Sequence, residues 1–219
     1  MSTTIWLTRH AETSAPTVFH GAESDIGLSD LGRRQTAAVA GWFAPLRPTA
    51  VVSSGMIRAR DTAAPIAAAC GVPHTIERDL HERRVGAMSG TSFSSASGPW
   101  PETIARWSAG ETGFTTPGAE SFDQLRARLV PALDRVVAAH SGGRVVVVAH
   151  GVVCKVLLLC LLPEYGPADW VRLGRIPNLA VSELRHDTGW AAVRLLQVPP
   201  PVAALSDGAP TGVGDKSQA

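Results

Sequence analysis

The sequence predicts a three-layer α/β fold, in which a mainly parallel sheet of about six strands carries helices on both faces. Short apolar runs alternate with amphipathic stretches of helical length, as in repeated strand–helix units. The run at residues 144–149 is rich in valine, which is typical of a strand buried on both faces. Two later segments flank Asp187-Thr188-Gly189 and predict a hairpin at the end of the sheet.

The first half of the chain begins with a buried strand centred on Ile5-Trp6-Leu7, followed by a loop rich in proline and glycine. Ser29 is suited to cap the helix that follows, and Pro45 lies beyond its end. We then expect a strand at residues 49–53, a helix over 56–70 and a short strand at 74–77.

Residues 80–117 are less regular, with a possible short helix over 102–108. Such a long irregular segment is usually a lid or specificity loop, and the alternative is a surface excursion without a role. The remaining elements are predicted as follows: an amphipathic helix over 121–139, a strand at 144–149, an apolar helix over 152–162, and hairpin strands at 179–185 and 191–198. We expect residues 1–198 to form one domain and the Pro/Gly/Ala-rich residues 199–219 to be a disordered tail.

The composition narrows the classes of partner. Hydrophobic residues make up 45% of the 219, enough for a sizeable core. The formal charge of +1 provides no overall field that would attract nucleic acid or a membrane, and the most apolar stretch, 152–162, is too short to cross a bilayer. The three cysteines have no metal-ligand spacing and no signal peptide is apparent, so we expect a cytoplasmic protein without a metal site. The sequence does not indicate an oligomeric state.

Five polar residues follow predicted strands that share one edge of the sheet: Arg9, His10, Arg58, Glu82 and His150. An Arg-His pair alone is more often structural than catalytic, but together the five match the needs of phosphoryl transfer through a histidine. A neutral imidazole is the nucleophile, fixed Arg and His donors hold the phosphoryl oxygens, and a carboxyl group protonates the leaving alcohol.

The same segments resemble, in order and spacing, the histidine phosphatase superfamily, branch 1, whose members are phosphoglycerate mutase-like. Its signature Arg-His-Gly-Glu-Thr/Ser and its Leu-Thr-x-x-Gly-x-x-Gln motif both have counterparts here. The matching segments are residues 7–13 (LTRHAET), 28–35 (LSDLGRRQ), 53–63 (SSGMIRARDTA), 80–86 (LHERRVG), 117–121 (PGAES) and 148–151 (VAHG).

The resemblance implies a phosphoglycerate mutase-like fold and a metal-independent phosphatase with no cofactor and a small phosphorylated substrate. It implies that His10 is phosphorylated, that Arg9, Arg58 and His150 bind the phosphate, and that Glu82 is the proton donor. Two alternatives stay open: phosphoryl transfer of the phosphoglycerate mutase type, and a catalytically weak member with a binding or regulatory role.

Three residues depart from the family pattern. Ala11 replaces a glycine and would be strained if its φ were positive. Pro16 stands where many members have a phosphate-binding asparagine, and Val85 replaces a tyrosine that mutases use near their substrate. Arg83 matches a family arginine and is a candidate to bind the substrate; otherwise it is a solvated loop charge.

Overall fold

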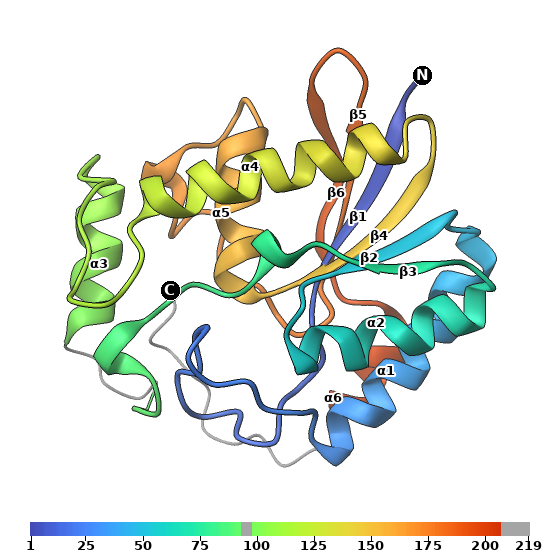
Figure 1. Ribbon diagram of the computed structural model, residues 1–219, viewed down its shortest axis with the longest axis horizontal. Coiled ribbons are helices and arrows are strands. Elements are labelled where there is room, and N and C mark those ends of the chain that lie inside the picture. Colours follow the sequence, from blue (N-terminus) through green and yellow to red (C-terminus); the bar gives the residue numbers. More distant parts are fainter. Residues whose placement is uncertain (93–97, 207–219) are drawn as a thin grey trace.

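The computed structural model describes residues 1–92 and 98–206 and contains a six-stranded sheet with the order β3-β2-β4-β1-β5-β6 (Figure 1). The strands β3, β2, β4 and β1 are mutually parallel, while β5 is antiparallel to both of its neighbours, β1 and β6. Their bounds are β1 (Thr3–Arg9), β2 (Ala50–Ser53), β3 (His74–Ile76), β4 (Arg144–Ala149), β5 (Val181–His186) and β6 (Trp190–Gln197). The predicted sheet of six mainly parallel strands is confirmed.

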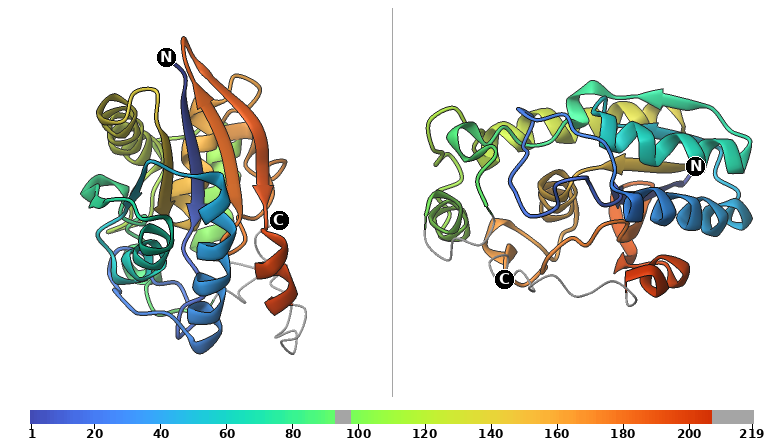
Figure 2. Two further views of the ribbon diagram at one scale, coloured as in Figure 1. Left: turned by 90° about the vertical axis from the view of Figure 1, so that its right-hand side faces the viewer. Right: turned by 90° about the horizontal axis from the view of Figure 1, so that it is seen from below.

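The helices cover both faces of this sheet (Figures 1 and 2). The α-helices are α1 (Asp30–Phe43), α2 (Ile57–Cys70), α3 (Pro99–Ser108), α4 (Phe122–Ala139), α5 (Gly151–Leu161) and α6 (Pro200–Ser206). The short 3-10 turns are η1 (Ala44–Leu46), η2 (Arg78–Leu80), η3 (Gly86–Met88) and η4 (Pro167–Asp169).

Alternate residues of the central strands face two separate cores. On β4, Val145 and Val147 pack with α4 and α5, whereas Val146 and Val148 pack with α1 and α2. All four valines are fully buried. This burial on both faces explains why β4 reads as a continuous apolar run rather than an alternating one.

Local sequence signals set the helix ends. The Ser29 hydroxyl accepts the Gly32 N–H at the start of α1. At the start of α4, Ser121 and Gln124 form a capping box, in which each side chain accepts the backbone N–H of the other residue. Gly71 ends α2 with a φ of 66°, a conformation that glycine adopts without steric cost.

The predicted disordered tail from residue 199 onward is wrong for its first part. Residues Pro200–Ser206 form α6, which lies beside α1 (Figure 2, left). Val202 is buried in the core on that side of the sheet. Its apolar contact with α1 stabilises a segment too short to show helical periodicity. Residues 207–219 lie outside the described part of the chain.

Within residues 1–92 and 98–206, none of the helices combines the length and hydrophobicity that a membrane crossing needs. In the segment predicted to be irregular, the helix expected over 102–108 begins earlier, at Pro99. This helix, α3, buries Trp100 and Trp107 against the core.

Candidate active site

The ends of three parallel strands bring the predicted residues together. Arg9 at the end of β1 lies opposite Ala149 of β4, and the His10 N–H donates to the Ala149 carbonyl at 2.9 Å. On the other side of β4, the Ser54 N–H donates to the Val148 carbonyl at 3.0 Å. His10 and His150 therefore follow neighbouring strands, and their ring centroids are 5.2 Å apart.

A hydrogen bond of the His10 ring indicates which of its nitrogens carries the proton. Its Nδ1 lies 2.7 Å from the Ala11 carbonyl oxygen. A carbonyl only accepts, so Nδ1 carries the proton, and Nε2 of the neutral ring keeps its lone pair. Burial, with the charges of Arg58 and Arg9, lowers the pKa of His10 well below 6.5. The ring is therefore neutral at physiological pH, the form that can act as a nucleophile.

Two arginines, the partly buried Arg9 and the buried Arg58, flank the histidines. Arg9 donates through Nη1 to the Ile176 carbonyl at 2.8 Å, while its buried Nε has no partner among the described residues. Burial and the neighbouring charge of Arg175 lower the pKa of Arg9 to about 10, so it stays protonated. Arg58, only 2% exposed, has two backbone partners on the loop between β1 and α1. These anchors fix two cations where an anion can approach them.

A hydroxyl group holds His150. The Ser54 Oγ lies 2.8 Å from Nε2 of His150 and also accepts the Met56 N–H at 3.3 Å. This arrangement favours donation of the hydroxyl proton to Nε2, which leaves the proton of the neutral ring on Nδ1. Nδ1 is buried and has no partner in the described chain. Burial lowers the pKa of His150 well below 6.5, so the ring offers a neutral donor.

Glu82 approaches the same group of side chains from the segment after η2. Its Oε1 accepts the Arg83 N–H at 2.8 Å. Burial lowers the pKa of both Arg9 and Arg58, and the charge of Glu82 offsets part of that lowering. The guanidinium of Arg128 on α4 donates to the backbone carbonyls of His81 and Glu82 at 2.9 and 3.2 Å. The α4 helix thereby holds the loop that carries the carboxyl group.

Arg83 is buried and is not paired with a carboxylate of the described residues. Its guanidinium carbon lies 5.0 and 5.1 Å from the ring centroids of Trp100 and Trp107. Its Nε donates to the Glu120 carbonyl at 2.9 Å, and both terminal nitrogens are buried without a partner among the described residues. The alternative of a solvated loop charge is wrong, because Trp100 and Trp107 cover the guanidinium. Contact with substrate stays a prediction.

Several supporting residues escaped the sequence reasoning. The Asn178 amide donates to the His10 carbonyl at 2.9 Å from a position 168 residues away, and no local pattern marks it. The Thr62 hydroxyl accepts the Ala11 N–H at 3.0 Å and donates to the Arg58 carbonyl at 2.7 Å, so it links the backbones of two functional segments. Ser54 and Thr62 both lie inside the 53–63 motif, so their membership of that motif was the sequence signal that could have identified them.

The glycine motif at residues 28–35 supports the backbone just after His10. Gln35 Oε1 accepts the Glu12 N–H, and the Ser29 N–H donates to the Glu12 carbonyl, both at 3.0 Å. A Cβ added to Gly32 would lie 2.1 Å from that carbonyl oxygen, so only glycine fits. The motif therefore fixes the backbone of the loop that follows His10.

The structure shows how two of the three residues that depart from the family pattern are accommodated. Ala11 is fully buried and does not have a positive φ, so its Cβ causes no backbone strain. Val85 is buried and forms a backbone bridge with Ala119. Nothing in the structure assigns a substitute for the asparagine that Pro16 replaces. Across residues 1–92 and 98–206, three or more His, Cys, Asp or Glu side chains never gather in a way that could hold a metal ion.

Comparison with known proteins identifies a family and relatives of similar sequence. The model of the histidine phosphatase superfamily (branch 1) matches residues 5–198. A protein of Arabidopsis thaliana named metal-independent phosphoserine phosphatase is 39% identical over 163 residues, which are 72% of this chain and 68% of the relative. The bifunctional protein Rv2228c of Mycobacterium tuberculosis is 34% identical over 197 residues, or 89% of this chain, which spans only 53% of that longer relative.

Solved structures show the same fold. A mycobacterial glucosyl-3-phosphoglycerate phosphatase superposes with a TM-score of 0.77 at 25% identity, covering 90% of this chain and 99% of that one. The YhfR protein of Bacillus stearothermophilus superposes with a TM-score of 0.79 at 21% identity, covering 91% and 99% of the two chains. At 21% identity, the similarity to YhfR supports a shared fold alone.

Proposed function

The chain belongs to the histidine phosphatase superfamily, branch 1, and on that premise we propose that it hydrolyses phosphomonoesters without a metal ion, through a phosphohistidine at His10. Its phosphatase class follows from the family and from relatives named as phosphatases. The roles of individual residues are the proposal.

One observation carries the assignment of His10. Its ring is buried and neutral, Nδ1–H is bound to the Ala11 carbonyl, and Nε2 is left as the free nucleophilic atom. Arg9, Arg58 and His150 lie around it and would hold the three peripheral oxygens of the phosphoryl group. Fixed charged donors of this kind stabilise the negative charge that develops during transfer.

The reaction then balances in two steps. Nε2 of His10 attacks phosphorus, a P–N bond forms, and the ester P–O bond breaks while Glu82 gives its proton to the leaving alcohol. Water next attacks phosphorus, its proton passes to the Glu82 carboxylate, and the P–N bond breaks to release inorganic phosphate and restore neutral His10. Within the described chain Oε2 of Glu82 makes no hydrogen bond, which supports this role.

Arg83 keeps its place in the proposal as a candidate for contact with substrate. Its support is the pair of buried terminal nitrogens that have no partner among the described residues. We propose cytoplasm as the compartment, since the odd number of cysteines, none of them paired in the described chain, fits a reducing environment. A small phosphorylated molecule is the substrate.

The test is release of inorganic phosphate from p-nitrophenyl phosphate and a panel of phosphorylated metabolites, with EDTA present, by the wild type and by His10→Ala. We expect chelator-resistant turnover that the variant lacks, and acid-labile phosphate on the wild-type protein after rapid quenching. A requirement for a bisphosphate primer would instead identify a mutase. A folded protein that is inactive on every substrate would favour a binding or regulatory role.

A further inference from the structure

One guanidinium group, that of Arg128 on α4, holds the backbone that carries Glu82. Its Nη1 donates to the carbonyls of Asp79 and His81 at 2.6 and 2.9 Å, and its Nη2 donates to the Glu82 carbonyl at 3.2 Å. Three carbonyls of neighbouring residues therefore converge on a single side chain. These bonds fix the course of the backbone from which the Glu82 carboxyl group projects.

The carboxylate of Glu120 orients this guanidinium. Oε1 accepts the Nε proton of Arg128 at 2.7 Å and Oε2 accepts an Nη2 proton at 2.9 Å, the paired geometry that gives an arginine a fixed orientation. The side chains of Arg128 and Glu120 are only 15% and 12% exposed, unlike the exposed ion pairs that contribute little. Glu120 Oε2 also accepts the Arg84 N–H at 2.8 Å, so the pair holds the chain before and after Glu82.

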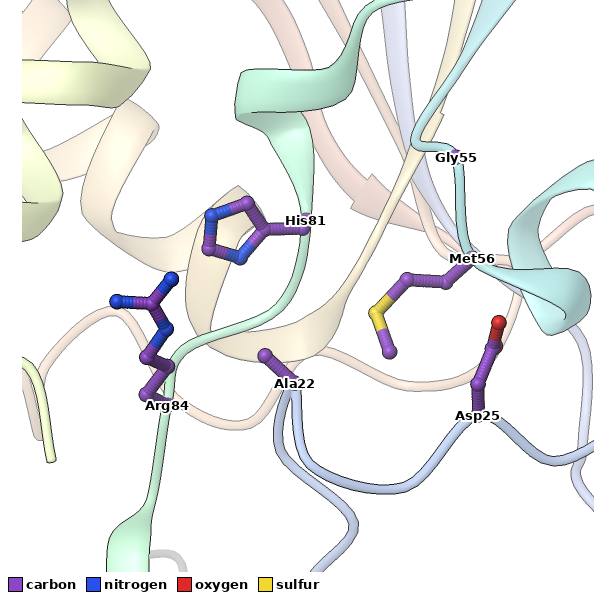
Figure 3. A pocket seen from close by; sticks show the side chains of 6 residues that line it. All are labelled: Ala22, Asp25, Gly55, Met56, His81 and Arg84. Carbon is purple, nitrogen blue, oxygen red and sulfur yellow. The ribbon is translucent and has the colours of Figure 1, made fainter. Parts of the chain in front are cut away.

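Two neighbours of Glu82, His81 and Arg84, do not anchor it through their own side chains. Both line an open pocket (Figure 3). Among the described residues, the His81 ring bonds only to the adjacent Glu82 carbonyl, and the exposed Arg84 guanidinium makes no hydrogen bond or ion pair. The side chain of Arg83 does reach another segment, where it donates to the backbone carbonyl of Glu120. The placement of Glu82 therefore depends on Glu120 and on the arginine that this carboxylate orients.

The carboxyl group of Glu82 has little other support. Its one hydrogen bond within the described chain is local, from the next N–H in the sequence. A general acid works only when its proton is within hydrogen-bond reach of the leaving oxygen, about 2.6–3.2 Å between heavy atoms. A displacement of about 1 Å can lower a rate by about 100-fold. Control of the backbone at Glu82 is thus control of proton donation.

We propose that Arg128, oriented by Glu120, is the positioning residue that directs the carboxyl group of Glu82 at the leaving oxygen. This inference rests on the proposed function, in which Glu82 protonates the leaving alcohol. A guanidinium has five N–H donors, and the Glu120 carboxylate and the three carbonyls engage all of them. No donor is left for the phosphate group, so Arg128 acts through Glu82.

The test compares two esters that differ in their need for an acid. The p-nitrophenolate ion is a weak base and departs without a proton, whereas phenolate is a stronger base and is helped by one. The quantity measured is kcat/KM for p-nitrophenyl phosphate and for phenyl phosphate, since kcat/KM covers the steps up to departure of the alcohol. The ratio of the two values is taken on one preparation, so a loss of folded protein cancels.

The expected effects depend on the leaving group. Glu82→Gln should lower kcat/KM for phenyl phosphate by about 100-fold and for p-nitrophenyl phosphate by about 5-fold or less. Arg128→Gln should lower the first by about 10-fold and the second by about 2-fold or less. In the Glu82→Gln background, Arg128→Gln should leave the ratio unchanged, because residues that act together are not additive.

Two further variants separate hydrogen bonding from charge and from general packing. Arg128→Lys keeps the charge but lacks the planar fork, so it should behave like Arg128→Gln. Arg135→Gln is the matched control on the same helix. Arg135 also reaches the region before Glu82, but it is 50% exposed and bonds to the carboxylates of Glu77 and Asp79 rather than to backbone carbonyls. The control should keep the wild-type ratio.

The outcomes separate this inference from the proposed function. If Glu82→Gln slows both esters equally, Glu82 is not the proton donor, and its proposed role and the inference both fail. If Glu82→Gln affects phenyl phosphate selectively but Arg128→Gln does not, Glu82 keeps its role and the inference alone is wrong. A wild-type ratio in Arg128→Lys, or an equal change of ratio in Arg135→Gln, would also overturn the assignment of Arg128.

Discussion

Removing the hydroxyl of Ser54 should reduce catalysis more than binding. Its Oγ is the only hydrogen-bond partner of the His150 ring among the described residues, at 2.8 Å from Nε2, and both residues are fully buried. In Ser54→Ala, Nε2 is buried without a partner, and such a group costs about 1–3 kcal/mol. Without this bond the ring is free to rotate or to move its proton to Nε2.

The expected effect on rate follows from the role of Nδ1. If Nδ1–H is the donor to a phosphoryl oxygen, loss of its orientation removes an interaction that strengthens in the transition state. A single donor of this kind contributes about 2–3 kcal/mol, so kcat should fall roughly 30- to 150-fold with a change in KM of about 2-fold or less. The free energy of unfolding should fall by about 1–3 kcal/mol.

The assay is steady-state hydrolysis of p-nitrophenyl phosphate together with urea unfolding followed by tryptophan fluorescence. Ser53→Ala is the matched control: its hydroxyl is also buried, but it contacts the Ser54 carbonyl and His74 rather than His150. The control should lose stability and keep its kcat. If Ser54→Ala has the kcat of the wild type despite its lower stability, then Ser54 does not position His150 and the assignment of Nδ1 as the donor is refuted.

Two further predictions concern stability. Gly32→Ala should destabilise the protein by about 2–3 kcal/mol in urea unfolding, because the new Cβ meets the Glu12 carbonyl oxygen at 2.1 Å. The control Gly41→Ala, on the same helix, has open space and should be neutral or stabilising. Equal effects of the two substitutions would show that Gly32 is not required for packing against Glu12. The lowered pKa values of His10 and His150 mean that the unfolded chain takes up protons below pH 6.5 while the folded chain does not, so this stability is present above pH 6.5 and is lost as the pH falls. Between pH 7.5 and 5.5 each ring should cost about 1 kcal/mol, and His150→Asn should unfold with a weaker pH dependence than the wild type.

The local sequence was sufficient to predict the fold and the candidate catalytic residues. The strand of β4 was recognisable because burial on both faces demands an unbroken apolar run, and the helix of α4 because one face alone is buried. His10 and His150 were recognisable because each directly follows a strand, and parallel strands end at one edge of the sheet. Each of these patterns lies within a few consecutive residues, so it can be recognised without knowing which distant segments pack against it.

The tertiary structure decided everything that depends on contacts between distant segments. Asn178 supports the His10 carbonyl across 168 positions, and Arg83 is buried because Trp100 and Trp107 from α3 cover it. The helix α6 exists because α1 offers it an apolar surface. Side-chain chemistry at strand ends is encoded locally, but the neighbours that orient, bury or pair those side chains come from packing, which no short sequence window contains.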